Sequence, residues 1–142
     1  MNREILFKAK RIDNGEWVEG MPLFYQDGSM TIYSQKQAQT VGFHIQNNGH
    51  CDRNTLCQCT GLNDKNGKLI WENDIVGYLD TYSTDNGYAE ADCIGQVVWD
   101  NETLSFQVTE RLSAESYEVL DECAVIGNIF DNKELLEGGA EE

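Results

Sequence analysis

The sequence predicts a mainly β protein made of two small β subdomains with little helix. Short runs of β-branched and aromatic residues recur along the chain, and clusters of Asn, Asp and Gly separate them. This alternation is typical of strands joined by tight turns. A chain of 142 residues, 40% of them apolar, suffices for one domain or for two β modules that share a core. We expect an N-terminal subdomain at 1–56, a C-terminal subdomain at 57–137 and a disordered tail at 138–142.

Two successive hairpins are expected at the start of the chain. Apolar and polar residues alternate over residues 5–10, Asp13-Asn14-Gly15 predicts a turn, and Trp17-Val18 opens the return strand. Residues 23–33 repeat this pattern around Asp27-Gly28-Ser29. An Asp-Gly pair between two aromatic or β-branched runs is a strong hairpin signal, so both hairpins follow from local sequence.

The chain becomes more polar after these hairpins. Residues 34–40 are rich in Gln and predict a loop or a short edge element, whereas residues 41–45 predict a strand. Residues 46–50 are polar throughout and predict a loop. We place the subdomain boundary near residue 56 and expect no flexible linker there.

The stretch from Gln58 to Val76 organises the chain, because it joins the two β-rich regions. Residues 63–67 end in Asn66-Gly67 and predict a hairpin turn. A short strand of Leu69, Ile70 and Trp71 follows, then a polar corner at residues 72–74 and a further strand from Ile75. Asp64, Asn66 and Gly67 are interpreted as turn formers and not as ligands.

The C-terminal part predicts further strands and one long loop. Residues 80–92 are polar and are expected to form a mobile or binding loop, because connections of that length in small domains often carry function. Residues 94–99 and 104–108 predict alternating strands, an arrangement that resembles a small SH3-like barrel. Residues 112–120 predict either a short helix or a strand. Residues 124–130 predict the closing strand with a bulge at Gly127, and Asn132 is expected to cap a helical turn that ends at Leu136.

Three groups of residues match the pattern of a known family. The chain opens with Arg3-Glu4-Ile5-x-Phe7 and Asp13-Asn14-Gly15-Glu16-Trp17-Val18-x-Gly20. Its centre carries Gln58-x-Thr60-Gly61-Leu62-x-Asp64-x-Asn66-Gly67 and Glu72-Asn73-Asp74-Ile75-Val76. It closes with Val125-Ile126-Gly127-Asn128-Ile129-Phe130-Asp131-Asn132 and Glu134-Leu135-Leu136. In this order and over nearly its whole length, the chain resembles the YopX family of bacteriophage and prophage proteins.

The resemblance has departures and limits. Cys57 and Cys59 stand where the family usually has a small or apolar residue and an aromatic one, and Lys133 stands where a proline is frequent. The family has no established biochemical activity. The resemblance therefore implies a phage or prophage protein but assigns no activity, cofactor or site residue.

The charge balance is the extreme feature of the composition. Ten basic and 25 acidic residues leave a net charge of −15, which disfavours direct binding to nucleic acid. The simplest interpretation is a soluble surface, and a sharper one is that the protein imitates DNA. No apolar run approaches the roughly 20 residues that span a bilayer, and Met1-Asn2-Arg3-Glu4 lacks the apolar core of a signal peptide. We expect no membrane contact and a location in the cytoplasm of the bacterial host.

His50, Cys51, Cys57 and Cys59 form the group that most resembles a metal site. Zinc sites usually draw ligands from Cys-x2–4-Cys knuckles, and the spacing here is Cys-x5-Cys-x-Cys. Cys57 and Cys59 point the same way if they lie on a strand. An odd number of five cysteines in a cytoplasmic protein favours reduced thiols that are buried as small apolar groups. We therefore assign no metal ligand, with bound metal as the alternative.

A second group of candidates is acidic and surrounds the predicted loop: Asp74, Asp80, Asp85, Glu90 and Asp92. The residues lack the alternating oxygens, glycine and terminal glutamate of a calcium loop. Paired carboxylates for acid–base catalysis require a geometry that sequence does not supply, so a solvated acidic loop is the favoured interpretation. His44 and His50 have no identifiable nucleophilic partner, and no phosphate loop, nucleophile elbow or His-Glu-x-x-His motif occurs. We assign no catalytic residue and no cofactor.

Trp17, Trp71 and Trp99 each fall in a predicted strand and are interpreted as core or subdomain-interface residues. The leading functional prediction is a non-enzymatic β-rich accessory protein. It is expected to work by protein–protein contact through unpaired strand edges, either with itself as a homo-oligomer or with a host or phage protein. One alternative is an acidic DNA-mimicking inhibitor of a host DNA-binding protein, and another is a small metal-dependent hydrolase that uses the acidic loop.

Overall fold

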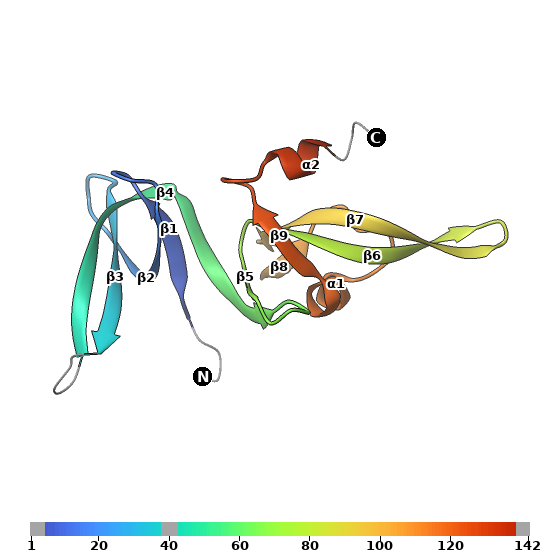
Figure 1. The fold of residues 1–142 in the computed structure, drawn as a ribbon, viewed down its shortest axis with the longest axis horizontal. Helices are drawn as coiled ribbons and strands as arrows, with labels where there is room; N and C mark the ends of the chain where they lie inside the picture. Colours follow the sequence, from blue (N-terminus) through green and yellow to red (C-terminus); the bar gives the residue numbers. More distant parts are fainter. Residues whose placement is uncertain (1–4, 38–42, 139–142) are drawn as a thin grey trace. The chain divides into compact units, whose positions relative to one another are not determined.

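A computed structural model describes residues 5–37 and 43–138 and confirms the mainly β class (Figure 1). Its elements are β1 (Phe7–Arg11), β2 (Trp17–Phe24), β3 (Met30–Gln37), β4 (Phe43–Asn63), β5 (Leu69–Trp71), β6 (Asp74–Thr84), β7 (Gly87–Asp100), β8 (Ser105–Val108), α1 (Ser116–Glu122), β9 (Ala124–Asn128) and α2 (Glu134–Gly138). The chain divides into two compact units, Met1–Cys59 and Thr60–Glu142, whereas the sequence indicated a boundary near residue 56.

The first unit is a cycle of antiparallel strands. β1 pairs with both β2 and β4, and β3 pairs with both β2 and β4, so each of these four strands pairs with two others of the cycle. Both predicted hairpins are present, with Gly15 and Gly28 at positive φ in their turns. Ala9, Met30, Ile32 and Cys51 form its buried core.

Residues 46–50 do not form the loop expected from sequence, and residues 34–37, for which a loop or a short edge element was expected, belong to β3. Ser34 pairs with Gln46 and Tyr33 with Asn47 in the ladder between β3 and β4. Asn48 is buried and its amide donates a 2.7 Å hydrogen bond to Ser34 Oγ. The prediction was wrong because ladder hydrogen bonds use main-chain groups, and polar side chains can satisfy one another across a strand pair. Residues 38–42, which hold the end of the polar stretch at 34–40 and the start of the strand expected at 41–45, lie outside the described residues.

The second unit contains an antiparallel sheet with the order β8-β7-β6-β9, and β5 pairs with β4. β6 and β7 form one long hairpin whose register runs from Ile75↔Gln96 to Thr84↔Gly87. The expected loop at residues 80–92 is therefore wrong, because the Asn86-Gly87 turn joins two paired strands. In Figure 1 the tip of this hairpin extends beyond the other strands of its sheet. The SH3-like comparison stays a prediction.

Shorter elements complete the second unit. α1 occupies the region where sequence left helix and strand open, and a capping box of Glu115 and Glu118 begins it. The predicted bulge of β9 is present: Ile75 pairs with Gly127 but Val76 with Val125, which leaves Ile126 as the extra residue. α2 covers the predicted helical turn. Gly138 ends α2, and the rest of the predicted disordered tail lies outside the described residues.

A cluster of buried side chains holds this second unit together: Ile70, Val76, Tyr78, Val97, Val108, Val119, Leu120 and Cys123. The three tryptophans differ in burial. Trp71 is buried, Trp17 is half-buried beneath the ammonium of Lys8 at 4.7 Å, and Trp99 is 42% exposed. Trp71 is thus a core residue as expected, whereas Trp99 lies outside the buried core and packs edge-to-face on Phe106.

Candidate functional site

The thiols that resembled a metal site are buried side chains of the first unit. Cys51, Cys57 and Cys59 are each at most 2% exposed, whereas His50 is exposed. None of the five cysteines is in a disulfide, and all except Cys93 are buried, as expected of small apolar groups. Among the described residues no group of three or more His, Cys, Asp or Glu is placed to hold a metal ion. These thiols therefore act as small apolar side chains that fill core positions.

Asp80 is not part of a solvated loop. It is buried on β6, and its carboxylate accepts hydrogen bonds from the main-chain N–H groups of Leu112 (2.8 Å), Ser113 (3.2 Å) and Ala114 (3.1 Å). Burial alone raises the pKa of Asp80, but these bonds and one from Thr81 outweigh it and lower the pKa to about 2. Asp80 therefore holds the chain before α1 as an acceptor that is ionised at neutral pH.

The acidic residues of the central signature also serve the fold. Asp64 Oδ1 accepts the N–H groups of Asn66 (2.9 Å) and Lys68 (2.8 Å), and Oδ2 accepts that of Val125 (2.8 Å). Asp74 Oδ2 accepts the N–H of Trp71 at 2.8 Å. The turn former predicted at Asp64 thus does more than close its own turn, because it also binds the closing strand. The other acidic candidates, Asp85, Glu90 and Asp92, are exposed on the β6–β7 hairpin.

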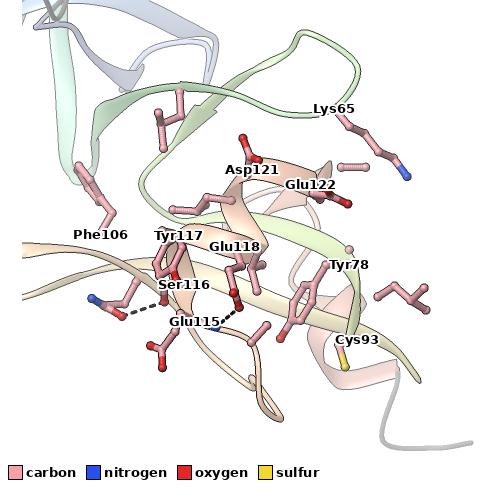
Figure 2. Close-up of a pocket in the computed structure, with 18 of the residues that line it drawn as sticks. Lys65, Tyr78, Cys93, Phe106, Glu115, Ser116, Tyr117, Glu118, Asp121 and Glu122 are labelled. Carbon is pink, nitrogen blue, oxygen red and sulfur yellow. Dashed lines mark hydrogen bonds between the residues drawn. The ribbon is translucent and has the colours of Figure 1, made fainter. Parts of the chain in front are cut away.

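A groove of about 1520 Å³ lies around α1 within the second unit (Figure 2). α1, strands β6 to β9 and the end of β4 contribute to its walls. Much of the lining is apolar and open to solvent, with Tyr117 72% and Leu79 59% exposed. The other large apolar residues of the lining are Leu62, Tyr78, Ile94, Phe106, Val119, Leu120 and Ile126.

The charged residues of the groove are predominantly acidic. Four of them lie along α1 in Figure 2: Glu115, Glu118, Asp121 and Glu122. Asp92 of β7 also lines the groove. Lys65 is the basic side chain among the described lining residues. The groove therefore combines an apolar floor with a negative rim.

Hydrogen bonds fix α1 against β8. The N–H of Val108 donates to Ser116 Oγ at 2.9 Å, and Ser116 Oγ donates to Gln107 Oε1 at 2.8 Å. The N–H of Glu115 donates to Glu118 Oε2 at 2.9 Å within the capping box. The site could not be predicted from sequence because residues 112–120 fitted either a short helix or a strand. The signal was the i, i+3, i+4 spacing of Ser116, Val119 and Leu120, the buried face of the helix.

Charge is distributed unequally between the two units. The first carries six basic and six acidic residues, and the second carries four basic and nineteen acidic residues. The first unit is therefore neutral overall, and the second unit holds the whole net charge of −15. The groove lies in the charged unit.

The outer strands of the C-terminal sheet are partly covered by side chains of the same chain. On β9, the N–H groups of Val125 and Asn128 donate to Asp64 Oδ2 and Asn132 Oδ1. On β8, the N–H of Val108 donates to Ser116 Oγ, and the carbonyl oxygen of Val108 accepts from Arg111 Nε at 2.9 Å. These bonds occupy groups that an added strand needs, so they disfavour the expected contact through strand edges.

The fold and the groove together define a β-rich protein of two units whose signature residues stabilise the second unit. The chain belongs to the YopX protein family, whose model matches residues 6–137. It is also similar to the crystal structure of protein EF1440 from Enterococcus faecalis, with 27% identity and a TM-score of 0.58, over 95% of this chain and 99% of that one. The search of curated proteins finds no match. Within the described residues, no helix has both the length and the apolarity needed to cross a membrane.

Proposed function

We propose that this YopX-family protein is a non-enzymatic phage or prophage accessory protein that acts by protein–protein contact in the bacterial cytoplasm. The observation that carries the proposal is the groove around α1. Large apolar side chains rarely stay exposed together unless another surface covers them, and the groove gathers several in one concave site. The free cysteines are consistent with a reducing compartment.

The surroundings of the acidic candidates support a non-enzymatic role. A general acid or base must exchange a proton near neutral pH, and the pKa of Asp80 is far below that range. Asp64 and Asp74 accept main-chain hydrogen bonds that stabilise turns. These carboxylates therefore favour a structural role over that of a metal-dependent hydrolase.

The partner is proposed to be a host or phage protein or a second copy of this chain. The test is co-purification from the infected host with the wild-type protein and two variants. Tyr117→Ser removes an exposed groove residue, and Tyr88→Ser removes a residue that is 82% exposed on β7 outside the groove. A partner held by wild type and Tyr88→Ser but lost by Tyr117→Ser supports the proposal. Retention of every partner by Tyr117→Ser would count against it, and light scattering of the same proteins measures self-association.

The uneven charge distribution favours a second candidate, an acidic DNA mimic that occupies a host DNA-binding protein. A single unit that carries all of the net charge presents a concentrated negative surface. This candidate expects capture of a DNA-binding protein, competition by duplex DNA, and loss of binding as salt rises. Binding that duplex DNA does not displace would exclude it.

A further inference from the structure

The groove combines two features that together describe its partner. Its exposed apolar residues, among them Leu79 and Ile94, are buried only if an apolar surface covers them. Its rim carries carboxylates from α1 and from β7, with Lys65 as the described basic lining residue. A segment that fills such a groove must therefore offer apolar side chains beside positive charges.

The position of Asp121 and Glu122 strengthens this conclusion. Both lie in the last turn of α1, where the helix dipole is negative and where no basic residue is present. Carboxylates at a helix C-terminus are unfavourable, so these two residues weaken the isolated helix. Within the described residues, neither they nor Asp92 form an ion pair. A cation from a partner would remove this repulsion.

We infer that the groove around α1 binds a Lys- or Arg-rich amphipathic segment of a partner protein. This inference rests on the proposed interaction function and specifies the chemistry of the partner. Nucleic acid is disfavoured because its phosphates would meet the negative rim. A second copy of the acidic unit is disfavoured by mutual repulsion of two charges of −15.

The test uses the full chain and three labelled peptides of equal length, read by fluorescence anisotropy. The first alternates Lys and Leu, the second alternates Glu and Leu, and the third alternates Lys and Ser. We expect the Lys–Leu peptide to bind and to weaken as salt rises, and the other two to bind at least tenfold more weakly. Equal binding of the Lys–Ser peptide would overturn the inference, because the apolar floor would then contribute nothing. Preferred binding of the Glu–Leu peptide would overturn it as well.

Two triple variants with the same net charge locate the binding site. Asp92→Asn, Asp121→Asn and Glu122→Gln neutralise three groove carboxylates. Asp85→Asn, Glu102→Gln and Glu134→Gln neutralise three exposed carboxylates of the same unit outside the groove. An exposed ion pair contributes a few-fold to affinity at most, so we expect about tenfold weaker peptide binding for the first variant and less than twofold for the second. Equal weakening of both would mean attraction by the whole unit and would overturn the inference.

Failure of this inference is distinguishable from failure of the proposed function. If Tyr117→Ser loses a natural partner while the Lys–Leu peptide does not bind, the proposed function stands and the basic partner is wrong. If Tyr117→Ser retains every natural partner, the groove is not the contact surface, and the observation that carries the proposed function is lost. If the chain dimerises and Tyr117→Ser abolishes the dimer, the groove binds a second copy of the chain. This result would also overturn the inference.

Discussion

The carboxylate of Asp64 accepts the main-chain N–H of Val125 at 2.8 Å, although the two residues are 61 positions apart in sequence. The same carboxylate closes the turn before β5 through Asn66 and Lys68. One side chain of the family signature therefore orders a local turn and holds the closing strand β9 in place. Because the Asp64 carboxylate binds the N–H of Val125, that N–H is not available to pair with an added strand.

Asp64→Ala is expected to lower the free energy of unfolding by roughly 2–4 kcal/mol. The substitution leaves three main-chain N–H groups without their acceptor, and a lost hydrogen bond to a charged group costs about 1.5–3 kcal/mol. Urea denaturation at pH 7 measures the change. Asp85→Ala, on the exposed hairpin tip, is the control and should stay within about 0.5 kcal/mol of wild type. An Asp64→Ala protein as stable as this control would contradict the role of the hydrogen bonds.

Asp80 makes stability depend on acid pH. Its pKa is about 2 in the folded protein, below the value of about 3.9 expected when the chain is unfolded. Its contribution is therefore complete above about pH 5 and is lost progressively as the pH falls toward 2. Asp80→Asn should lower the urea midpoint at pH 7 and show a smaller decline between pH 4 and pH 2.5 than wild type. Asp85→Asn should keep the wild-type pH profile, and an unchanged profile for Asp80→Asn would refute this assignment.

Gly95 is required because the main chain approaches it closely. A Cβ atom at this position would lie 2.3 Å from the carbonyl oxygen of Thr109 and 2.9 Å from Val108 Cγ1. Gly95→Ala is therefore expected to destabilise the protein by roughly 1–3 kcal/mol. Gly77, on the neighbouring strand β6, is the matched control, since a Cβ there meets Ile126 Cγ2 at 3.9 Å. Gly77→Ala should leave stability unchanged or raise it by up to about 1 kcal/mol, as measured by thermal and urea unfolding.

The thiols are expected to react slowly in the folded protein. Burial raises the pKa of Cys123 to about 11, and Cys51, Cys57 and Cys59 are also buried. Cys93 is half-buried, so a thiol-specific reagent at pH 7 should label this residue first and all five cysteines only after denaturation. Cys93→Ser should abolish the early labelling. Rapid labelling of several thiols in native Cys93→Ser would show that the buried cysteines are accessible.

Local turn chemistry explains which elements were predictable. Asp13-Asn14-Gly15, Asp27-Gly28-Ser29 and Asn66-Gly67 select their turns through glycine conformation and short side-chain bonds, and each turn occurs as expected. The same chemistry at Asn86-Gly87 was present but was interpreted as part of a loop. Polar strands escaped prediction because Asn48 and its neighbours gain their partners from β3, which local sequence does not reveal.

The site was less predictable than the fold. The sequence indicated a surplus of acidic residues, but not that Asp80 is buried against the chain before α1 while Asp92 lines a groove. Strand edges were the expected contact surface, and side chains of Asp64, Asn132 and Ser116 occupy donors on them instead. Each of these facts depends on residues brought together from distant positions.

By itself the sequence determined the β class, the hairpin turns, the family pattern and the excess of negative charge, because composition and turn preference are properties of neighbouring residues. Only the tertiary structure decided which carboxylates become buried acceptors and which stay at the rim of the groove. The physical reason is that a carboxylate owes its surroundings to partners far along the chain. Asp64 meets Val125, and Asp80 meets the main chain from Leu112 to Ala114, after the strands have paired.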